Sequence, residues 1–350
     1  MRVAFLEPLD RVAQDMPPKF LGDHDVLIAP APGELPAGYQ DADAIVWSKT
    51  PIDAEFIDAM PNLKLLQRLG KFRATGDASR AFEKGIPVSV LPHGTSGRVA
   101  EHTYTLLVGL FRQLIRSHTA VVENQNPSGL APEEQIPGNT PGLNWSRLAG
   151  LQSIQYKTIG IAGFGEIGAC LAQFLRPFNC RVLYYKRGQL TPEEEAFYGI
   201  SYASFEDLLK TSDAVCNLVP VSEPTRGMFG EKEFGLMKPT AYFVNTGRAW
   251  TTDENALAKA LTEGTIGGAG IDVFSYEPLQ PGHPLQHAPR TLFTPHTAGG
   301  GGNENVSIGG LMGWTDTFER IAENLRRVEA REPVLSPMGE HDPLPTGASR

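Results

Sequence analysis

Residues 157–168 read KTIGIAGFGEIG, and this stretch decides the fold. An apolar run is followed by Gly163, Gly165 and Gly168, spaced as G-x-G-x-x-G, and by a helical pattern over residues 166–176. In such a strand–turn–helix the first glycine permits a tight turn. The second lets the backbone approach a pyrophosphate, and the third lets helix and strand pack closely. The start of the helix offers free amides to phosphate oxygens. The predicted dinucleotide-binding residues are Gly163, Phe164, Gly165, Glu166, Ile167 and Gly168.

Short apolar runs alternate with helical patterns, which is typical of parallel strands joined by helical crossovers. From the motif onward, six strands are predicted at residues 158–162, 181–185, 214–219, 241–245, 268–272 and 291–294. The helices between them are predicted at residues 166–176, 205–210, 231–237 and 254–263. Six strands with crossovers make a complete doubly wound sheet.

The first hundred residues form a second alternating series. Strands are predicted at residues 3–6, 26–29, 44–47, 63–66 and 88–91, with helices at residues 52–60 and 78–84. Long helices are predicted over residues 100–122 and 303–329. Seven of the residues from 127 to 142 are proline or glycine, which predicts an irregular arm at residues 124–145. We therefore predict an α/β protein with two doubly wound parallel-sheet domains and no internal sequence repeat.

The strand at residues 181–185 is followed by Lys186 and Arg187. A site for NAD usually carries a carboxylate about 20 residues after the glycines, where it binds the ribose 2′-hydroxyl. Here Lys186 lies 18 residues after Gly168, and no carboxylate ends the strand. Cations attract a 2′-phosphate, so NADP(H) is favoured. NAD(H) stays possible if both cations are solvated and the backbone recognises the cofactor.

The composition excludes several classes of protein. A formal charge of −9 argues against binding nucleic acid, which requires a basic surface. No apolar stretch is long enough for a membrane span, and charges near the N-terminus leave no secretory signal. The three cysteines form no C-x-x-C pair, which favours a reducing, cytoplasmic location. The histidines show no metal-ligand spacing, so no metal is predicted.

Three further segments follow later strands, at the strand ends where open α/β sheets bind ligands. They are VNTGRAW with Arg248, GAGIDVFSYEP with Asp272 and Glu277, and LFTPHTAGG with His296. Together with the glycine motif, AEHTYTLL at residues 100–107 and the run from residue 213 to 248, they closely resemble the D-isomer-specific 2-hydroxyacid dehydrogenase family. The resemblance extends from about residue 63 to residue 324 and is carried by several motifs in order.

The resemblance implies a flavodoxin-like substrate domain made of residues 1–98 and 299–350. A Rossmann-type dinucleotide-binding domain, residues 99–298, would be inserted into it. It also implies an active site between the domains, a small 2-oxoacid or 2-hydroxyacid substrate, and a homodimer joined through the cofactor domains. The residues implied to contact the cofactor beyond the glycine motif and the two cations are Val219, Pro220, Thr225, Thr246, Gly247, Asp272, His296 and Ala298. For Val219 and Pro220, ordinary packing at a strand end is an equal alternative.

The chemistry of the three catalytic candidates agrees with this resemblance. Arg248 carries a planar fork of donors that suits a carboxylate and can also polarise a carbonyl. His296 is a suitable general acid, because imidazole titrates near neutral pH. Glu277 would bind His296, fix its tautomer and favour its protonated form. In oxidation the same pair would run backwards, with neutral His296 as the base.

The sequence departs from the family in the loop after Leu69, where relatives carry a pattern like GVGYDNID. Here it reads GKFRATGD, and the predicted substrate-binding residues are Gly70, Lys71, Phe72, Arg248 and His296. The added cations Lys71 and Arg73 indicate either a second acidic group on the substrate or solvated side chains. The arm at residues 124–145 would either cap the partner subunit's cleft or extend the dimer interface.

The predicted function is hydride transfer between NAD(P)H and a 2-oxoacid or D-2-hydroxyacid, with glyoxylate or hydroxypyruvate as the generic substrate. Two alternatives remain open: a formate- or phosphonate-type dehydrogenase of the same superfamily, and a non-catalytic nucleotide-sensing corepressor. The Glu277–His296 pair argues against formate oxidation, which needs no proton relay to an alkoxide. The complete set of Arg248, Glu277 and His296 argues against the sensor.

Overall fold

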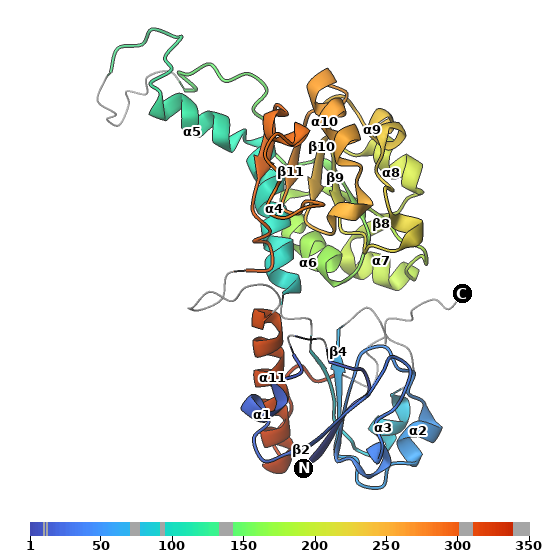
Figure 1. The fold of residues 1–350 in the computed structure, drawn as a ribbon. Helices are drawn as coiled ribbons and strands as arrows, with labels where there is room; N and C mark the ends of the chain where they lie inside the picture. Colours follow the sequence, from blue (N-terminus) through green and yellow to red (C-terminus); the bar gives the residue numbers. More distant parts are fainter. Residues whose placement is uncertain are drawn as a thin grey trace. The chain divides into compact units, whose positions relative to one another are not determined.

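The computed structural model describes residues 1–9, 11, 13–70, 78–91, 95–132, 143–300 and 311–338, the side chains of 311–313 excepted. The chain divides into two compact units. Unit 1 comprises Met1–Arg98 and Gly299–Arg350, and unit 2 comprises Val99–Ala298. Each unit contains one parallel sheet (Figure 1).

The sheet of unit 1 has five parallel strands in the order β2-β1-β3-β4-β5, which is the flavodoxin-like order. The strands are β1 (Arg2–Phe5), β2 (Asp25–Ile28), β3 (Ala44–Trp47), β4 (Leu65–Leu69) and β5 (Val88–Leu91). The helices of the unit are α1 (Pro17–Phe20), α2 (Ala54–Asp58), α3 (Ser79–Glu83) and α11 (Leu311–Glu329), with a 3-10 turn η1 (Tyr39–Asp41).

Alternate residues of these strands pack against opposite helical layers. Val3 and Val46 lie in an apolar cluster with Phe318 and Leu325 of α11. Their neighbours on the same strands, such as Ile45, lie in a second cluster with α2 and α3. The sheet is therefore covered on both faces, as the period of two along a strand requires.

The C-terminal helix is tied to the N-terminal sheet by a buried polar group. The Asn324 side-chain amide donates to Gln67 Oε1 (2.7 Å) and Ser89 Oγ (2.9 Å), and its carbonyl accepts from Leu335 N (2.6 Å). Asn324 is fully buried, so these bonds satisfy an amide that would otherwise be costly to bury. Residues from both ends of the chain thus build one core.

The sheet of unit 2 has seven parallel strands in the order β12-β11-β10-β9-β6-β7-β8. The strands are β6 (Thr158–Ala162), β7 (Arg181–Tyr185), β8 (Ile200–Tyr202), β9 (Ala214–Asn217), β10 (Tyr242–Asn245), β11 (Gly268–Ile271) and β12 (Thr291–Phe293). The first six of these in chain order have the Rossmann order, which reverses between β6 and β9. The predicted fold class, two doubly wound parallel sheets, is confirmed.

Helices cover both faces of this sheet (Figure 1). The helices of unit 2 are α4 (Ser96–Phe111, which begins just before the unit boundary), α5 (Leu114–Val122), α6 (Glu166–Leu175), α7 (Pro192–Tyr198), α8 (Phe205–Thr211), α9 (Glu231–Leu236) and α10 (Glu254–Glu263). The 3-10 turns are η2 (Arg176–Phe178), η3 (Glu223–Thr225), η4 (Ala249–Thr251) and η5 (Pro284–His287).

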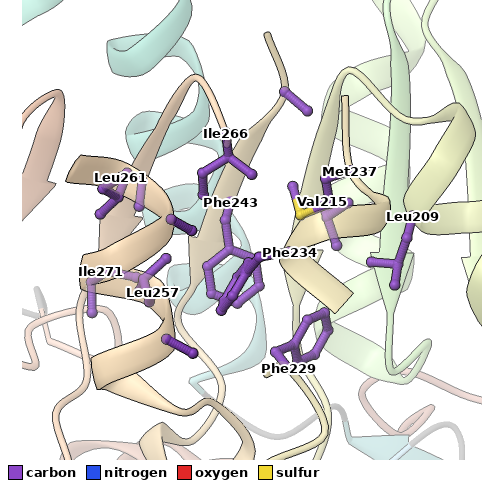
Figure 2. Close-up of a cluster of buried hydrophobic side chains, with 14 of the residues drawn as sticks. Leu209, Val215, Phe229, Phe234, Met237, Phe243, Leu257, Leu261, Ile266 and Ile271 are labelled. Atoms are coloured by element: carbon purple, nitrogen blue, oxygen red, sulfur yellow. The ribbon is translucent and has the colours of Figure 1, made fainter. Parts of the chain in front are cut away.

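One face of this sheet packs against α8, α9 and α10 in a large apolar core (Figure 2). Phe243 of β10 lies at its centre, 5.0 Å from the Phe229 ring and 5.2 Å from the Phe234 ring. On the opposite face α4 approaches β11 so closely that a Cβ on Gly270 would lie 3.1 Å from Leu106 Cβ. The strand ends near β6 and β9 are therefore held on a rigid scaffold.

Two predictions about helices need correction. The helix predicted over residues 100–122 is broken into α4 and α5, because Gln113 adopts a left-handed conformation (φ 48°). The apolar pattern continues through the break, so periodicity could not reveal it. In α5, Leu114, Ile115, Val121 and Val122 are exposed in the single chain. The first eight residues of the helix predicted over 303–329 lie outside the described residues, and α11 begins at Leu311.

The prediction of six strands for unit 2 was also wrong, because β8 and the helix before it, α7, were missed. Two of the three residues of β8 are exposed, so this edge strand lacks the apolar run of a buried strand. The described parts of the arm, residues 124–132 and 143–145, contain neither helix nor strand, as predicted. Within the described residues, no helix combines the length and apolar character that a bilayer crossing requires.

Candidate active site

The glycine turn joins β6 to α6 with the shape that the sequence predicts. Gly163 has φ +88°, and a Cβ there would lie 2.6 Å from the Leu218 carbonyl. A Cβ on Gly168 would lie 3.1 Å from the Phe164 ring. Gly165, the N-cap of α6, has no atom within 4 Å of the place where a Cβ would stand. Packing thus excludes a side chain at Gly163 and leaves little room for one at Gly168, whereas Gly165 opens onto free space.

This opening is what a pyrophosphate needs in order to approach the backbone. Glu166 and Ile167, the first two residues of α6, are half-buried beside it. The ring of Phe164 is buried and packs 5.2 Å from the Tyr184 ring. Only the backbone of Phe164 is available to a ligand. The turn therefore fits a dinucleotide through backbone groups.

The two cations after β7 differ in their surroundings. Lys186 is half-buried, and burial lowers the pKa of its ammonium, although the Glu194 charge acts to raise it. Arg187 is exposed. Glu194 itself is engaged in the capping box of α7, where its carboxylate accepts from Thr191 N (2.9 Å). Lys186 is therefore not a freely solvated surface lysine.

The loops after β9 and β10 pack against each other and use several predicted cofactor residues internally. The Thr225 hydroxyl donates to Pro220 O (2.7 Å), and Thr246 Oγ1 lies 2.6 Å from Thr103 Oγ1 of α4. Val219 is buried in the core cluster, next to the glycine turn, whereas Pro220 is exposed. A Cβ on Gly247 would lie 2.9 Å from the Asn217 carbonyl, so this close approach requires glycine.

Arg248 lies three residues beyond the end of β10, beside the end of β11. It is exposed, and its Nη1 donates to the Gly247 carbonyl (2.7 Å). Among the ion pairs of the described residues, none involves Arg248. The guanidinium is thus held close to its own backbone and keeps its remaining donors for another partner.

His296 and Glu277 form a close pair. His296 Nδ1 lies 2.6 Å from Glu277 Oε2, and about half of the His296 side chain is exposed. The other carboxylate oxygen of Glu277 accepts from Phe274 N (3.0 Å), so the carboxylate is fixed from both sides. Because Nδ1 is engaged, Nε2 is the ring atom that can exchange a proton with a ligand. The structure brings these two predicted residues together across 19 positions of sequence.

Asp272 fixes the backbone that carries His296. Its buried carboxylate accepts from Thr294 Oγ1 (2.6 Å), Thr297 N (2.9 Å) and Ala298 N (2.9 Å), and its carbonyl accepts from His296 N (2.8 Å). His296 itself has a left-handed backbone (φ 54°), which is uncommon for a residue with a side chain. The carboxylate predicted to face the nicotinamide is therefore occupied in holding the histidine loop.

His102 of α4 also approaches this buried carboxylate. Its Nε2 lies 2.9 Å from Thr294 Oγ1 and 3.4 Å from Asp272 Oδ1. The sequence marked His102 only as part of a structural motif. Sequence reasoning also missed Glu254 and His283, which stand behind the loop that carries Glu277. Nothing in the local sequence distinguishes them, because their contacts cross 21 and 29 positions.

The predicted substrate residues of unit 1 are only partly described. Gly70 has φ +89° and donates its amide to Leu91 O (2.8 Å). Lys71, Phe72 and Arg73 lie outside the described residues. The described residues contain no cluster of three or more histidine, cysteine, aspartate or glutamate side chains placed to hold a metal ion.

Comparison with known proteins decides the family. A profile of "D-isomer specific 2-hydroxyacid dehydrogenase, NAD binding domain" matches residues 105–298. The glyoxylate reductase of Thermococcus litoralis is 36% identical over 252 residues, covering 71% of this chain and 72% of the relative. That of Thermofilum pendens is 34% identical over 270 residues, covering 77% of this chain and 76% of the relative. This chain belongs to the D-isomer-specific 2-hydroxyacid dehydrogenase family.

Solved structures extend the match over nearly the whole chain. The glyoxylate reductase of Paecilomyes thermophila, a 2-hydroxyacid dehydrogenase relative at 26% identity, covers 98% of this chain and 99% of its own, with a TM-score of 0.54. The resemblance inferred from the motifs is thus confirmed. As a D-2-hydroxyacid dehydrogenase or 2-oxoacid reductase, the chain is an oxidoreductase that uses a nicotinamide cofactor.

Proposed function

We propose that this enzyme reduces a small 2-oxoacid such as glyoxylate or hydroxypyruvate, preferring NADPH, and oxidises the corresponding D-2-hydroxyacid. The observation that carries the proposal is the 2.6 Å contact between His296 Nδ1 and Glu277 Oε2, on a half-exposed ring. Proton transfer to an alkoxide requires such a group. The relatives described above, named glyoxylate reductases, support the choice of substrate class.

Arg248 is proposed to bind the substrate carboxylate and to polarise the adjacent carbonyl. Its exposed guanidinium keeps donors in a planar fork, which matches the two oxygens of a carboxylate. Gly70, Lys71 and Phe72 of unit 1 are proposed to contact the same substrate. The assignment to Lys71 and Phe72 rests on sequence alone.

In the reductive direction, protonated His296 donates the Nε2 proton to the developing alkoxide oxygen. Glu277 accepts from Nδ1, which fixes the tautomer and stabilises the imidazolium. In the oxidative direction, neutral His296 takes the hydroxyl proton at Nε2. When bound, the nicotinamide supplies or accepts the hydride. Asp272 holds the histidine loop throughout, through its contacts with Thr297 N and Ala298 N.

The preference for NADPH rests on Lys186 and Arg187. A half-buried ammonium at the end of β7 has lost part of its hydration, so an added phosphate oxygen would compensate it. The backbone of the glycine turn, from Gly163 to Gly168, is proposed to hold the pyrophosphate. Val219, Pro220, Thr225, Thr246, Gly247 and Ala298 remain proposed lining residues for the ribose and nicotinamide.

A panel of 2-oxoacids and 2-hydroxyacids, each assayed with NADPH and NADH by absorbance of the reduced nicotinamide, tests the proposal. Turnover of small 2-oxoacids, with a higher kcat/KM for NADPH than for NADH, is expected. Oxidation of formate or phosphonate without turnover of any 2-oxoacid would contradict the proposal. Cofactor binding without any turnover would favour a nucleotide sensor instead.

We further propose that the enzyme is a homodimer joined through unit 2. Helix α5 projects from the body of the unit (Figure 1) and carries Leu114, Ile115, Val121 and Val122 on one face, all more than half exposed. Leu114 and Ile115 line a cavity of about 610 Å³, together with residues of α4 and of the starts of β10 and β12. Light scattering coupled to gel filtration tests this, and a monomer at micromolar concentration would contradict it. A cytoplasmic location stays a prediction from sequence.

A further inference from the structure

The loop that carries Glu277 is anchored by a carboxylate from a different element. Glu254 Oε1 accepts from Ser275 N (2.8 Å), two residues before Glu277. The Glu254 side chain is only 10% exposed. It is the first residue of α10, where the helix dipole stabilises a negative charge. The loop from Phe274 to Glu277 is thus held by two carboxylates, one of them its own.

His283 faces the second oxygen of the same carboxylate. Its Nε2 lies 3.4 Å from Glu254 Oε2, and its side chain is 16% exposed. Leu285 N donates to His283 Nδ1 (3.3 Å), so the ring proton is carried by Nε2 and points toward Glu254. The carboxylate of Glu254 therefore has a partner on each oxygen, behind the catalytic loop.

Both anchoring elements are rooted in the apolar core. Leu257 and Leu261 of α10 point into the core of unit 2 (Figure 2). The turn η5 follows His283 directly, and its residue Leu285 is fully buried in the same core. An anchor on such packed elements cannot follow the loop if the loop shifts.

We propose that Glu254 and His283 are positioning residues, which hold Ser275 so that Glu277 stays within hydrogen-bonding distance of His296. This inference rests on the proposed acid–base role of His296. The contact between His296 and Glu277 joins two exposed side chains on irregular segments, so the pair alone contributes little free energy to holding the two segments together. A shift of about 1 Å in a catalytic group can cost about 100-fold in rate.

The test compares Glu254→Ala with Glu263→Ala, which removes an exposed glutamate at the other end of the same helix. Glu254→Ala is expected to lower kcat for 2-oxoacid reduction by about 10- to 100-fold with the KM for NADPH unchanged. The pH at which the reductive rate falls should move lower, in the same direction as in Glu277→Gln, because a displaced carboxylate no longer stabilises the imidazolium. Glu263→Ala should change neither quantity.

Two further variants separate positioning from folding. Glu254→Gln keeps an acceptor for Ser275 N and should retain more activity than Glu254→Ala, with the same thermal unfolding temperature as Glu263→Ala. His283→Asn, compared with His287→Asn on the exposed side of η5, should move the pH profile in the same direction by a smaller amount.

Hydrogen–deuterium exchange provides a readout that does not depend on turnover. Exchange of the peptide spanning residues 274–277 should be faster in Glu254→Ala than in wild type and in Glu263→Ala. A Glu254→Ala enzyme with wild-type exchange, or with an unmoved pH profile, would overturn the inference. Failure of the wild-type enzyme to reduce any 2-oxoacid would instead overturn the proposed function, whereas the exchange result would still report on the anchor.

Discussion

At the scale of single residues, the proposed site uses side chains that bond to the protein with some of their polar atoms and keep the others for a ligand. His296 gives Nδ1 to Glu277 and keeps Nε2, and Arg248 gives one donor to Gly247 O and keeps the others. The carboxylate of Asp272, in contrast, accepts hydrogen bonds only from the protein, namely from Thr294, Thr297 and Ala298, among the contacts of the described residues. A residue's exposure and its internal partners thus separate groups that meet the substrate from groups that hold them.

Arg248→Lys tests the proposed carboxylate contact at this scale. A lysine keeps the charge but cannot make two parallel hydrogen bonds, so kcat/KM for a 2-oxoacid should fall about 10- to 100-fold. The Kd for NADPH, measured by fluorescence titration, should stay the same and serves as the control. Near-normal kcat/KM would remove Arg248 from substrate binding.

At the scale of elements, the two sheets share one arrangement of hydrogen bonds around an aspartate. Asp43 precedes β3 and Asp213 precedes β9, and each exchanges hydrogen bonds with the residue that begins the neighbouring strand, Arg2 or Thr158. Each carboxylate also accepts from one lysine, Lys64 (2.6 Å) or Lys238 (2.8 Å). The central strands of both units are therefore aligned by the same carboxylate geometry.

This arrangement predicts that the difference in stability between wild type and Asp213→Asn depends on pH. Burial acts to raise the pKa of Asp213, but the bonds from Lys238 and Thr158 outweigh it and hold the pKa below the ordinary value. The ionised group therefore stabilises the fold above its unfolded pKa, and this contribution is lost as pH falls through the folded pKa. Asp213→Asn should lose about 1–2 kcal/mol at pH 7.

Thermal unfolding of both proteins from pH 7 to pH 3 checks this expectation. The difference in Tm between wild type and Asp213→Asn should shrink below about pH 4, the unfolded range of an aspartate. Asp207→Asn, at an exposed position of α8, provides a carboxylate control in the same unit. A Tm difference that is constant with pH would contradict the account.

The two cations that follow β7, Lys186 and Arg187, lead to a prediction about the preferred cofactor. Replacing Lys186 and Arg187 together by serine should lower kcat/KM for NADPH about 10- to 100-fold and leave that for NADH nearly unchanged, because only the 2′-phosphate is lost as a partner. Both constants come from initial rates with one saturating 2-oxoacid. An equal fall in kcat/KM for NADPH and for NADH would show that these cations do not bind the 2′-phosphate.

At the scale of the whole molecule, both ends of the chain build unit 1, and Asn324 is a buried polar link between them. Asn324→Leu would leave Gln67, Ser89 and Leu335 N without this partner, so the free energy of unfolding of unit 1 should fall by about 1–3 kcal/mol. Denaturant unfolding measures this loss, and replacement of Asn255, an exposed residue of α10 in the other unit, is the control. An unchanged midpoint would contradict the role of Asn324.

Much of this architecture was predictable from local sequence. β6, β7 and α10 were predicted with the observed bounds, because buried parallel strands and capped amphipathic helices leave apolar runs and periodicity. Edge strand β8 was missed because it lacks the apolar run of a buried strand, and the break at Gln113 was missed because the apolar pattern continues through it. The equivalent places of Asp43 and Asp213 in the two sheets were also missed, because one matching residue in each half of the chain cannot be recognised as a sequence repeat.

The residues of the candidate site also fall into two groups, those that local sequence predicted and those that only the folded chain brings together. The glycine turn, Arg248, Glu277 and His296 stand in contiguous motifs at strand ends, and the sequence predicted each of them. The anchors Glu254, His283 and His102 act through contacts between distant segments, which only the folded chain reveals. The internal use of the Asp272 carboxylate was likewise invisible in the sequence, because it depends on backbone amides.

The central claim is that His296 moves the proton in a nicotinamide-dependent reduction of a 2-oxoacid. The most direct test is kcat of His296→Ala with a 2-oxoacid and NADPH, alongside the Kd for NADPH measured on the same protein. If His296 transfers the proton, kcat should be lowered by about 10²- to 10⁴-fold with the Kd essentially unchanged. A variant that keeps wild-type kcat would contradict it.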